Sequence, residues 1–141
     1  MFWIYSVVLF VVAWHDIRTK RIPDAVNALL AAIGTVHLIV IAGLQLEIYL
    51  RSISCTLLIF SLLLAVAAIS NGGIGGGDIK LASALTIPTA ALGVDQLILA
   101  WFWVCLTTIP VGIAMLFQKI TWKSTIPFGP CLAVGYLFAL V

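Results

Sequence analysis

Long apolar runs separated by short polar stretches dominate this sequence. The runs are continuously apolar, whereas the strands of a transmembrane barrel alternate in polarity, so the pattern predicts helices. Six runs are present, at Met1–Trp14, Ala25–Gly43, Ile53–Ile69, Ile79–Val94, Leu97–Phe117 and Ile126–Val141. The sequence therefore predicts an all-α fold of about six helices.

The composition identifies lipid as the expected solvent of these helices. Of the 141 residues, 64% are hydrophobic and only 9% are charged, whereas about a quarter of a soluble domain is charged. Crossing a bilayer takes about 20 mostly apolar residues per helix, and backbone groups in lipid must bond internally. We expect an integral membrane protein, a polytopic bundle of about six transmembrane helices that forms a single domain over residues 1–141.

The basic residues predict how the chain is oriented in the membrane. The stretches after the first, third and fifth runs contain all but one of them, namely Arg18, Lys20, Arg21, Lys80, Lys119 and Lys123, and the opposite side contains Arg51. Cytoplasmic loops are enriched in Lys and Arg, so we expect a cytoplasmic (inner) membrane protein with both termini outside. We interpret the first run as a membrane helix and not as a cleaved leader. The net charge of +2 is too small to indicate nucleic-acid binding.

Five carboxylates are candidates for chemistry: Asp16, Asp24, Glu47, Asp78 and Asp95. Acidic groups at membrane depth are costly and are functional candidates by default. Glu47 and Asp95 fall in predicted outside turns, where a solvated loop charge explains them. Asp24 follows a proline and precedes an apolar run, which is the pattern of a helix N-cap. We therefore favour a capping role for Asp24 over a catalytic one.

Asp16 and Asp78 are expected at similar depth near the cytoplasmic face. If their helices are neighbours, the two carboxylates meet, and a close pair retains one proton near neutral pH. The ionised member then takes a proton from water that attacks a peptide carbonyl, while the protonated member donates to the developing oxyanion. For Asp16 considered alone, a charge paired with Arg18 or Lys20 at the interface is the simpler interpretation.

The segment before Asp78 is rich in glycine, with glycines at positions 72, 73, 75, 76 and 77. Such a cluster destabilises helix and allows a substrate backbone or a neighbouring helix to approach closely. The structural alternative is a flexible loop followed by a capping Asp78. A phosphate-binding loop is disfavoured, because no Gly-Lys-Ser/Thr sequence follows and the carboxylate would repel phosphate.

Three segments resemble the prepilin and preflagellin peptidases, which are intramembrane aspartic peptidases with a G-x-G-D motif. GIGGGDIK at Gly73–Lys80 contains that motif, and HDIRTKRIPD at His15–Asp24 is similar to the segment that joins the first two helices of the peptidase domain. IPFGPCLAVG at Ile126–Gly135 resembles the terminal P-F-G-P segment. The three motifs occur in the family's order across nearly the whole chain.

The resemblance implies that Asp16 and Asp78 are the catalytic pair of an endopeptidase. It implies that this enzyme cleaves a short basic leader from prepilin-like or preflagellin-like proteins at the cytoplasmic face. The motif positions assigned to substrate approach are Gly75, Gly76, Gly77, Lys80, Pro127, Gly129 and Pro130. For Lys80, an influence on Asp78 ionisation and simple snorkelling of the side chain both stay open, and Pro127 and Pro130 are expected to break the helix before the last span.

The cysteines mark a departure from many bacterial members, whose paired C-x-x-C motifs are linked to N-methylation. Cys55, Cys105 and Cys131 lie in different apolar runs, so the chain resembles the short stand-alone peptidases, and whether it also methylates its product stays open. The scattered carboxylates, histidines and cysteines predict no metal site and no cofactor.

Two other classes of function remain open. A small transporter or channel would use Asp16 and Asp78 as a proton or cation site, although the two-fold repeat of many transporters is not evident here. A structural membrane subunit would make the glycine-rich segment incidental.

Overall fold

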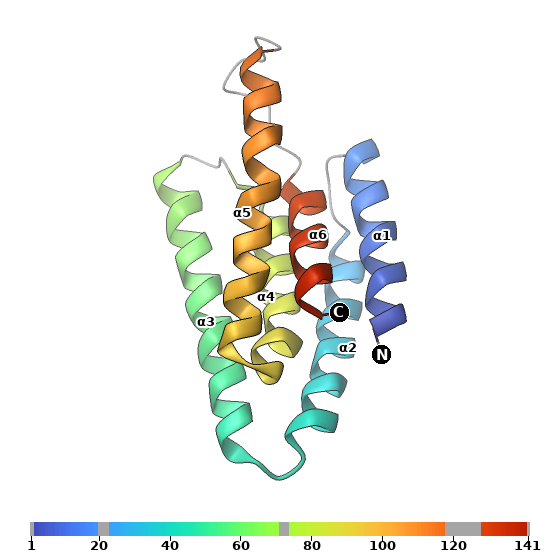
Figure 1. The fold of residues 1–141 in the computed structure, drawn as a ribbon, viewed down its shortest axis with the longest axis vertical. Coiled ribbons are helices and arrows are strands. Elements are labelled where there is room, and N and C mark those ends of the chain that lie inside the picture. The colour runs from blue at the N-terminus through green and yellow to red at the C-terminus, as the bar shows by residue number, and fades with distance from the viewer. Residues whose placement is uncertain (1, 20–22, 71–73, 118–127, 141) are drawn as a thin grey trace.

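A computed structural model describes residues 2–19, 23–70, 74–117 and 128–140, and this part of the chain forms six helices and no strands (Figure 1). The helices are α1 (Phe2–Thr19), α2 (Asp24–Ala42), α3 (Leu46–Ile69), α4 (Gly76–Leu92), α5 (Val94–Phe117) and α6 (Phe128–Leu140). The prediction of an all-helical chain with six helices is confirmed.

Helix α4 is the centre of the bundle, because it packs against α2, α3, α5 and α6. It is buried on nearly all sides, and many of its buried residues are small, such as Ala82, Ala84 and Ala90. Small side chains let neighbouring backbones approach closely. A Cβ atom on Gly34 of α2 would lie 3.0 Å from Pro88 Cδ and 3.2 Å from the Ala84 carbonyl oxygen, so glycine is required at this contact.

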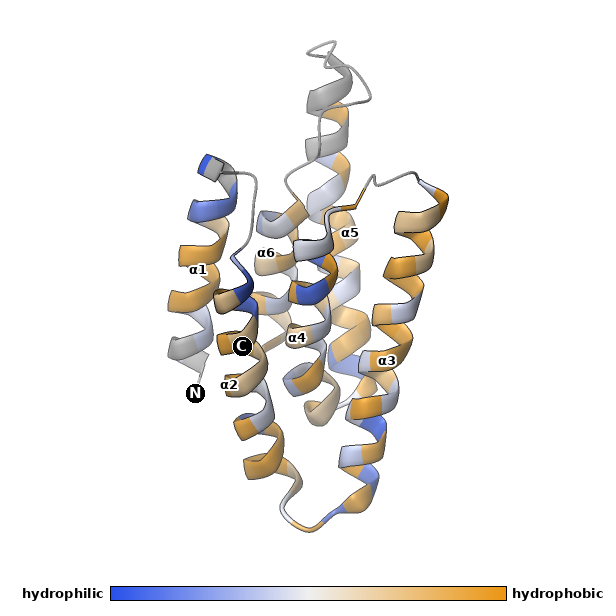
Figure 2. Ribbon diagram, turned by 180° about the vertical axis from the view of Figure 1, so that it is seen from behind, coloured by the Kyte–Doolittle hydropathy of each residue, from blue (hydrophilic) through white to orange (hydrophobic). Residues whose placement is uncertain are grey.

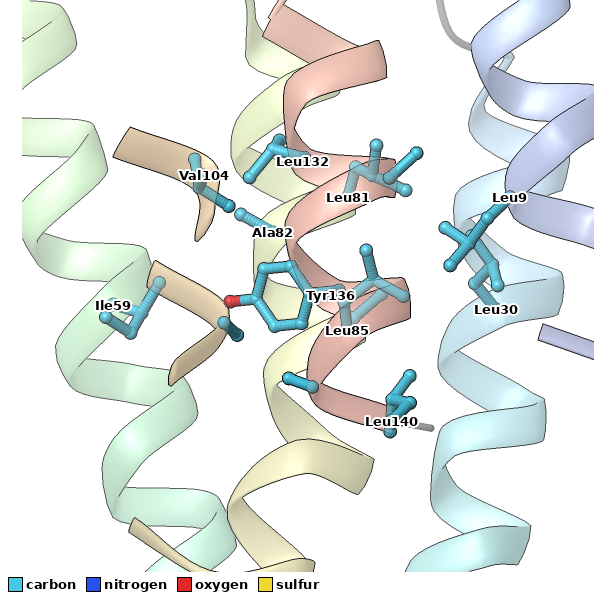
Figure 3. Packing of buried hydrophobic residues seen from close by; sticks show 14 of the residues in the cluster. Leu9, Leu30, Ile59, Leu81, Ala82, Leu85, Val104, Leu132, Tyr136 and Leu140 are labelled. Carbon is cyan, nitrogen blue, oxygen red and sulfur yellow. The ribbon is translucent and has the colours of Figure 1, made fainter. Parts of the chain in front are cut away.

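Helix α6 connects α1 to the rest of the bundle, since it packs against α1, α4 and α5. Figure 3 shows leucines from four helices around this contact, together with the ring of Tyr136. Tyr136 is fully buried, and its hydroxyl forms a 2.9 Å hydrogen bond with Thr86 Oγ1. This contact is therefore mainly apolar, and the buried hydroxyl of Tyr136 has a hydrogen-bond partner, as buried hydroxyls usually do.

The outer faces of the bundle are strongly apolar. Figure 2 shows hydrophobic residues along the outer faces of α2 and α3, and large side chains such as Trp3, Phe10 and Ile69 are 84%, 70% and 83% exposed. Within the described residues, α2 and α3 are the two helices that are long and apolar enough to cross a membrane. Exposed apolar surface of this extent marks an interaction with lipid or protein.

The chain direction alternates, so that α1, α3 and α5 end and α2, α4 and α6 begin at the same end of the bundle, which is the upper end in Figure 1. The short connections α2–α3 and α4–α5 lie at the opposite end. Asp16 near the end of α1 and Asp78 near the start of α4 are therefore both at the upper end.

Several helix boundaries differ from the predicted runs. Helix α1 continues through Asp16 to Thr19, and α3 begins at Leu46 instead of Ile53. Arg51, expected as an outside loop charge, lies within α3, and its side chain reaches the carboxyl end of α4. Its Nε donates to the Ala90 carbonyl at 2.9 Å and its Nη2 to the Ala91 carbonyl at 2.8 Å. Helix α4 begins at Gly76, so it starts within the glycine-rich segment and not after it.

Candidate active site

Asp16 lies in the last part of α1 and is buried, with 4% of its surface exposed. Its carboxylate packs directly on the backbone of Gly129 at the start of α6, because a Cβ atom on Gly129 would lie 2.5 Å from Asp16 Oδ2. Oδ2 has no hydrogen-bond partner among the described residues. A buried carboxylate oxygen without a partner is costly, which makes Asp16 a candidate functional residue.

Helix α6 brings Gly129 to Asp16 by beginning at Phe128. Pro130 is half-buried in its first turn, where the missing backbone N–H of proline would have no intrahelical partner in any case. This position fits the predicted helix break before the last span. Pro127 lies outside the described residues.

Asp78 is the third residue of α4, and Gly75 occupies the N-cap position. The Asp78 N–H donates to the Gly75 carbonyl at 3.0 Å, and the Asp78 carboxylate accepts a hydrogen bond from the Gly75 backbone. An acidic side chain at this position reaches back to the N-cap N–H, as in a capping box. A Cβ atom on Gly75 would lie 3.2 Å from Asp78 Oδ2, so glycine gives the carboxylate room.

Both aspartates lie just outside the apolar runs Met1–Trp14 and Ile79–Val94, and both have perturbed ionisation. Burial and, after it, the negative charge of Asp16 together raise the pKa of Asp78 to about 6, against the hydrogen bond from the Gly75 backbone, which lowers it. Burial also raises the pKa of Asp16, against a hydrogen bond from the Gly129 backbone and the nearby charge of His15. The structure thus brings the two carboxylates close enough for the charge of Asp16 to raise the pKa of Asp78.

The predicted capping role of Asp24 is wrong. Helix α2 begins at Asp24, Pro23 occupies the N-cap position, and no side chain caps this end. The carboxylate of Asp24 instead forms a 2.7 Å ion pair with Lys80 Nζ, and both side chains are more than half exposed. The long lysine side chain reaches across from α4, which a local sequence pattern does not reveal.

Asn27 is a residue of the site that the sequence analysis did not identify. It is 5% exposed, and its Nδ2 donates to the carbonyl of Gly77 at 3.3 Å. Asn27 thereby ties α2 to the residue immediately before Asp78. The sequence did offer a signal for Asn27, because it is an amide side chain within a mainly apolar run. Polar side chains are rare in such runs unless they have a structural or functional partner.

The remaining candidate residues are placed as follows. Gly76 begins α4 with open space around its Cα, since a Cβ there would meet nothing within 4 Å. Glu47 and Asp95 lie in the first turns of α3 and α5, at the end of the bundle opposite to Asp16 (Figure 1). In the part of the chain that the structure describes, no three His, Cys, Asp or Glu side chains are grouped to hold a metal ion.

Comparison with known proteins adds two findings. Residues 3–113 match the profile of the type IV leader peptidase family. Over 81 residues the chain is 37% identical to a protein of Bacillus subtilis (strain 168) named prepilin leader peptidase/N-methyltransferase. The matched region covers 57% of this chain and 32% of that protein, so the chain spans less than two thirds of its relative. No solved structure shows a significant match.

Proposed function

Because the chain belongs to the type IV leader peptidase family, we propose that it is an aspartic endopeptidase in which Asp16 and Asp78 are the catalytic pair. The observation that carries this proposal is the coupling of the two carboxylates. Asp16 is buried against Gly129 with a free Oδ2, and its charge helps to raise the pKa of Asp78 to about 6. A pair that holds one proton supplies a base and an acid together.

The two members of the pair have different partners, which suggests their roles. Burial raises the pKa of Asp16, but the backbone hydrogen bond from Gly129 and the charge of His15 oppose that rise, so we assign Asp16 as the base that removes a proton from water. Asp78, whose pKa is about 6, acts as the acid that protonates the carbonyl oxygen as the hydroxyl group attacks the peptide carbon. The tetrahedral intermediate collapses when the proton held by Asp16 reaches the leaving nitrogen and the C–N bond breaks, while one hydroxyl group of the intermediate returns its proton to Asp78 as the carbonyl forms again.

A membrane location supports this chemistry. The exposed apolar faces of α1, α2 and α3 and the two helices able to cross a membrane suit lipid as solvent, and we propose a multi-pass protein with Asp16 and Asp78 at the cytoplasmic face. Labelling of single cysteines introduced at Lys20, Lys123 and Glu47 tests this orientation. Positions 20 and 123 should react only from the cytoplasmic side and position 47 only from outside, and the reverse pattern would refute the orientation.

The proposed substrate is a prepilin-like or preflagellin-like protein with a short basic leader followed by an apolar helix. The relative's name, prepilin leader peptidase/N-methyltransferase, supports this class. The proposal is limited to the peptidase reaction, for which Asp16 and Asp78 are the proposed catalytic residues.

Co-expression with a prepilin-like substrate tests the function as a whole. The substrate should become smaller by the mass of its leader when the unaltered enzyme is present, and it should keep its full size with Asp16→Asn or Asp78→Asn. Glu47→Gln and Asp95→Asn are controls, since these residues lie at the opposite end of the bundle. Because a transporter that used the same aspartates would also lose its activity, the readout must be cleavage of the peptide bond. Unchanged processing by both aspartate variants would refute the proposal.

A further inference from the structure

A groove opens between α2 and α3 on the face of α4 that points away from Asp78. It has a volume of about 460 Å³ and is lined by residues of all three helices, among them Asn27, Ala31, Thr56, Phe60, Ser83 and Ala84. We refer to it as the α2–α3 groove. In Figure 2, α4 is seen behind and between α2 and α3. Asp24 and Lys80, which form the ion pair between α2 and α4, also line the groove and lie at its upper end.

Asn27 gives the groove an unsatisfied hydrogen-bond acceptor. The side chain is 5% exposed, and its Nδ2 is fixed on the carbonyl of Gly77, which determines which way the amide faces. Its Oδ1 has no partner among the described residues. Leaving a buried acceptor unpaired is unfavourable, and the residue lines an otherwise apolar cavity. A ligand that matched the apolar lining and satisfied this acceptor would be mainly apolar and would carry an N–H or O–H donor.

We infer that the α2–α3 groove binds the first turn of the apolar helix of the substrate, an inference that rests on the proposed peptidase function. The first four N–H groups of any helix lack intrahelical acceptors, and one of them can donate to Asn27 Oδ1 while apolar side chains contact Ala31 and Phe60. A lipid acyl chain fills an apolar groove but offers no donor. The carboxylate of Asp24 complements the positive end of the helix dipole, and its exposed pair with Lys80 opens at little cost.

The geometry of α4 determines where the scissile bond lies relative to this anchor. At about 100° per residue, the groove positions Lys80, Ser83 and Ile87 point roughly opposite to Asp78. The substrate must therefore cross the first turn of α4 between the groove and the aspartates, a width of about 10 Å that takes about three extended residues. Gly76 leaves space for this crossing, since a Cβ there would meet nothing within 4 Å.

Disulfide cross-linking tests where the substrate binds. The enzyme carries Asp78→Asn to prevent turnover, its three cysteines are replaced by alanine, and Ser83→Cys is introduced in the groove. Val134→Cys is the matched control, because Val134 lines an apolar groove of similar volume, about 480 Å³, between α1 and α6. A substrate with one cysteine in the first apolar turn should cross-link to position 83 and not to position 134. The inference is overturned if position 134 reacts equally, or if position 83 does not react.

A double-mutant cycle tests the hydrogen bond itself. In a synthetic substrate, one first-turn amide is replaced by an ester, which removes a single N–H, and Asn27 is changed to Leu, which removes the acceptor at similar volume. At the matching position, the ester should raise KM about tenfold for the unaltered enzyme and have almost no further effect with Asn27→Leu. If the effects of the ester and of Asn27→Leu on KM multiply at every position of the substrate, the hydrogen bond to Asn27 is refuted. That result would fit a groove occupied by lipid.

The two proposals fail in distinguishable ways. If the unaltered enzyme does not cleave the substrate, the proposed function is wrong. If it cleaves the substrate while either the cross-link at position 83 or the coupling at Asn27 is absent, only the groove assignment is wrong.

Discussion

The two ends of α4 are held in contrasting ways. At the carboxyl end, Arg51 donates to the carbonyls of Ala90 and Ala91, Ser52 Oγ donates to the Ile87 carbonyl at 2.7 Å, and the Gly93 N–H donates to the Thr89 carbonyl at 3.2 Å. The last carbonyls of a helix have no intrahelical partners. Of the last four carbonyl groups of α4, those of Thr89, Ala90 and Ala91 accept hydrogen bonds here. The donors are residues that are not part of the candidate site.

At the amino end, α4 begins with two glycines and contacts polar groups whose bonding is incomplete. Asp16 Oδ2 and Asn27 Oδ1 are buried there without partners among the described residues. Unsatisfied buried polar atoms are rare in stable folds and tend to occur where function requires them. Under the proposed function, the carboxyl end stabilises the fold, whereas the amino end is arranged for a ligand. Substitutions at the two ends should therefore differ in whether they change activity or stability.

The largest effect on activity outside the aspartates is expected at Gly129. In Gly129→Ala the added methyl group would overlap Asp16 Oδ2, which lies 2.5 Å from the position that the new Cβ would occupy, so the carboxylate must move. We expect a loss of at least about a hundredfold in kcat/KM, within the range of acid–base catalysis. Gly135→Ala on the same helix would instead press on Val104, lowering stability with a smaller effect on kcat/KM of the folded enzyme. Equal losses of kcat/KM in Gly129→Ala and Gly135→Ala would contradict the proposed difference between the two ends.

The next largest effect is expected on stability at the carboxyl end. Arg51→Met removes a charged donor from two carbonyl groups, and we expect a loss of about 2 kcal/mol in the free energy of unfolding. Unfolding in mixed micelles measures this loss, and cleavage per folded molecule should stay within a few-fold of normal. A variant that is as stable as the parent but inactive would show that this end serves catalysis instead.

The pH dependence should follow the proton on Asp78. Because burial raises the pKa of this carboxyl from its ordinary value of 3.8 to about 6, the acid form is lost as pH rises through about 6. We expect kcat/KM to fall about tenfold per pH unit above that point. By the same linkage, the contribution of Asp78 to stability should increase as pH falls from about 6 towards 4. Activity that rises steadily between pH 6 and pH 8 would contradict the assignment of Asp78 as the acid.

The smallest effect is expected from the ion pair between Asp24 and Lys80. Both side chains are more than half exposed, and exposed pairs contribute about 0–1 kcal/mol. Asp24→Asn and Lys80→Met should therefore each change the free energy of unfolding by less than about 1 kcal/mol, well below the effect of Arg51→Met. A loss as large as that of Arg51→Met would mean that the amino end is also a stabilising element.

The sequence predicted the six helices, because continuous apolar runs are a strong local signal, and it identified the segments around Asp16, Asp78 and Gly129. It did not predict the side-chain contacts between helices. Arg51 was assigned to an outside loop although it bonds to carbonyls about 40 residues away, and Asp24 was assigned as a cap although it pairs with Lys80. These choices depend on which helices are neighbours, and local spacing of polar residues carries no such information.

The central claim is that Asp16 and Asp78 act as one catalytic unit, and the most direct test is a double-mutant cycle on purified enzyme. The kcat/KM for leader cleavage is measured for Asp16→Asn, Asp78→Asn and the double variant, with folding confirmed for each. Each single change should remove at least about a thousandfold of activity, and the double variant should be hardly worse than either. Substantial cleavage by either single variant, or losses that multiply in the double variant, would contradict the claim.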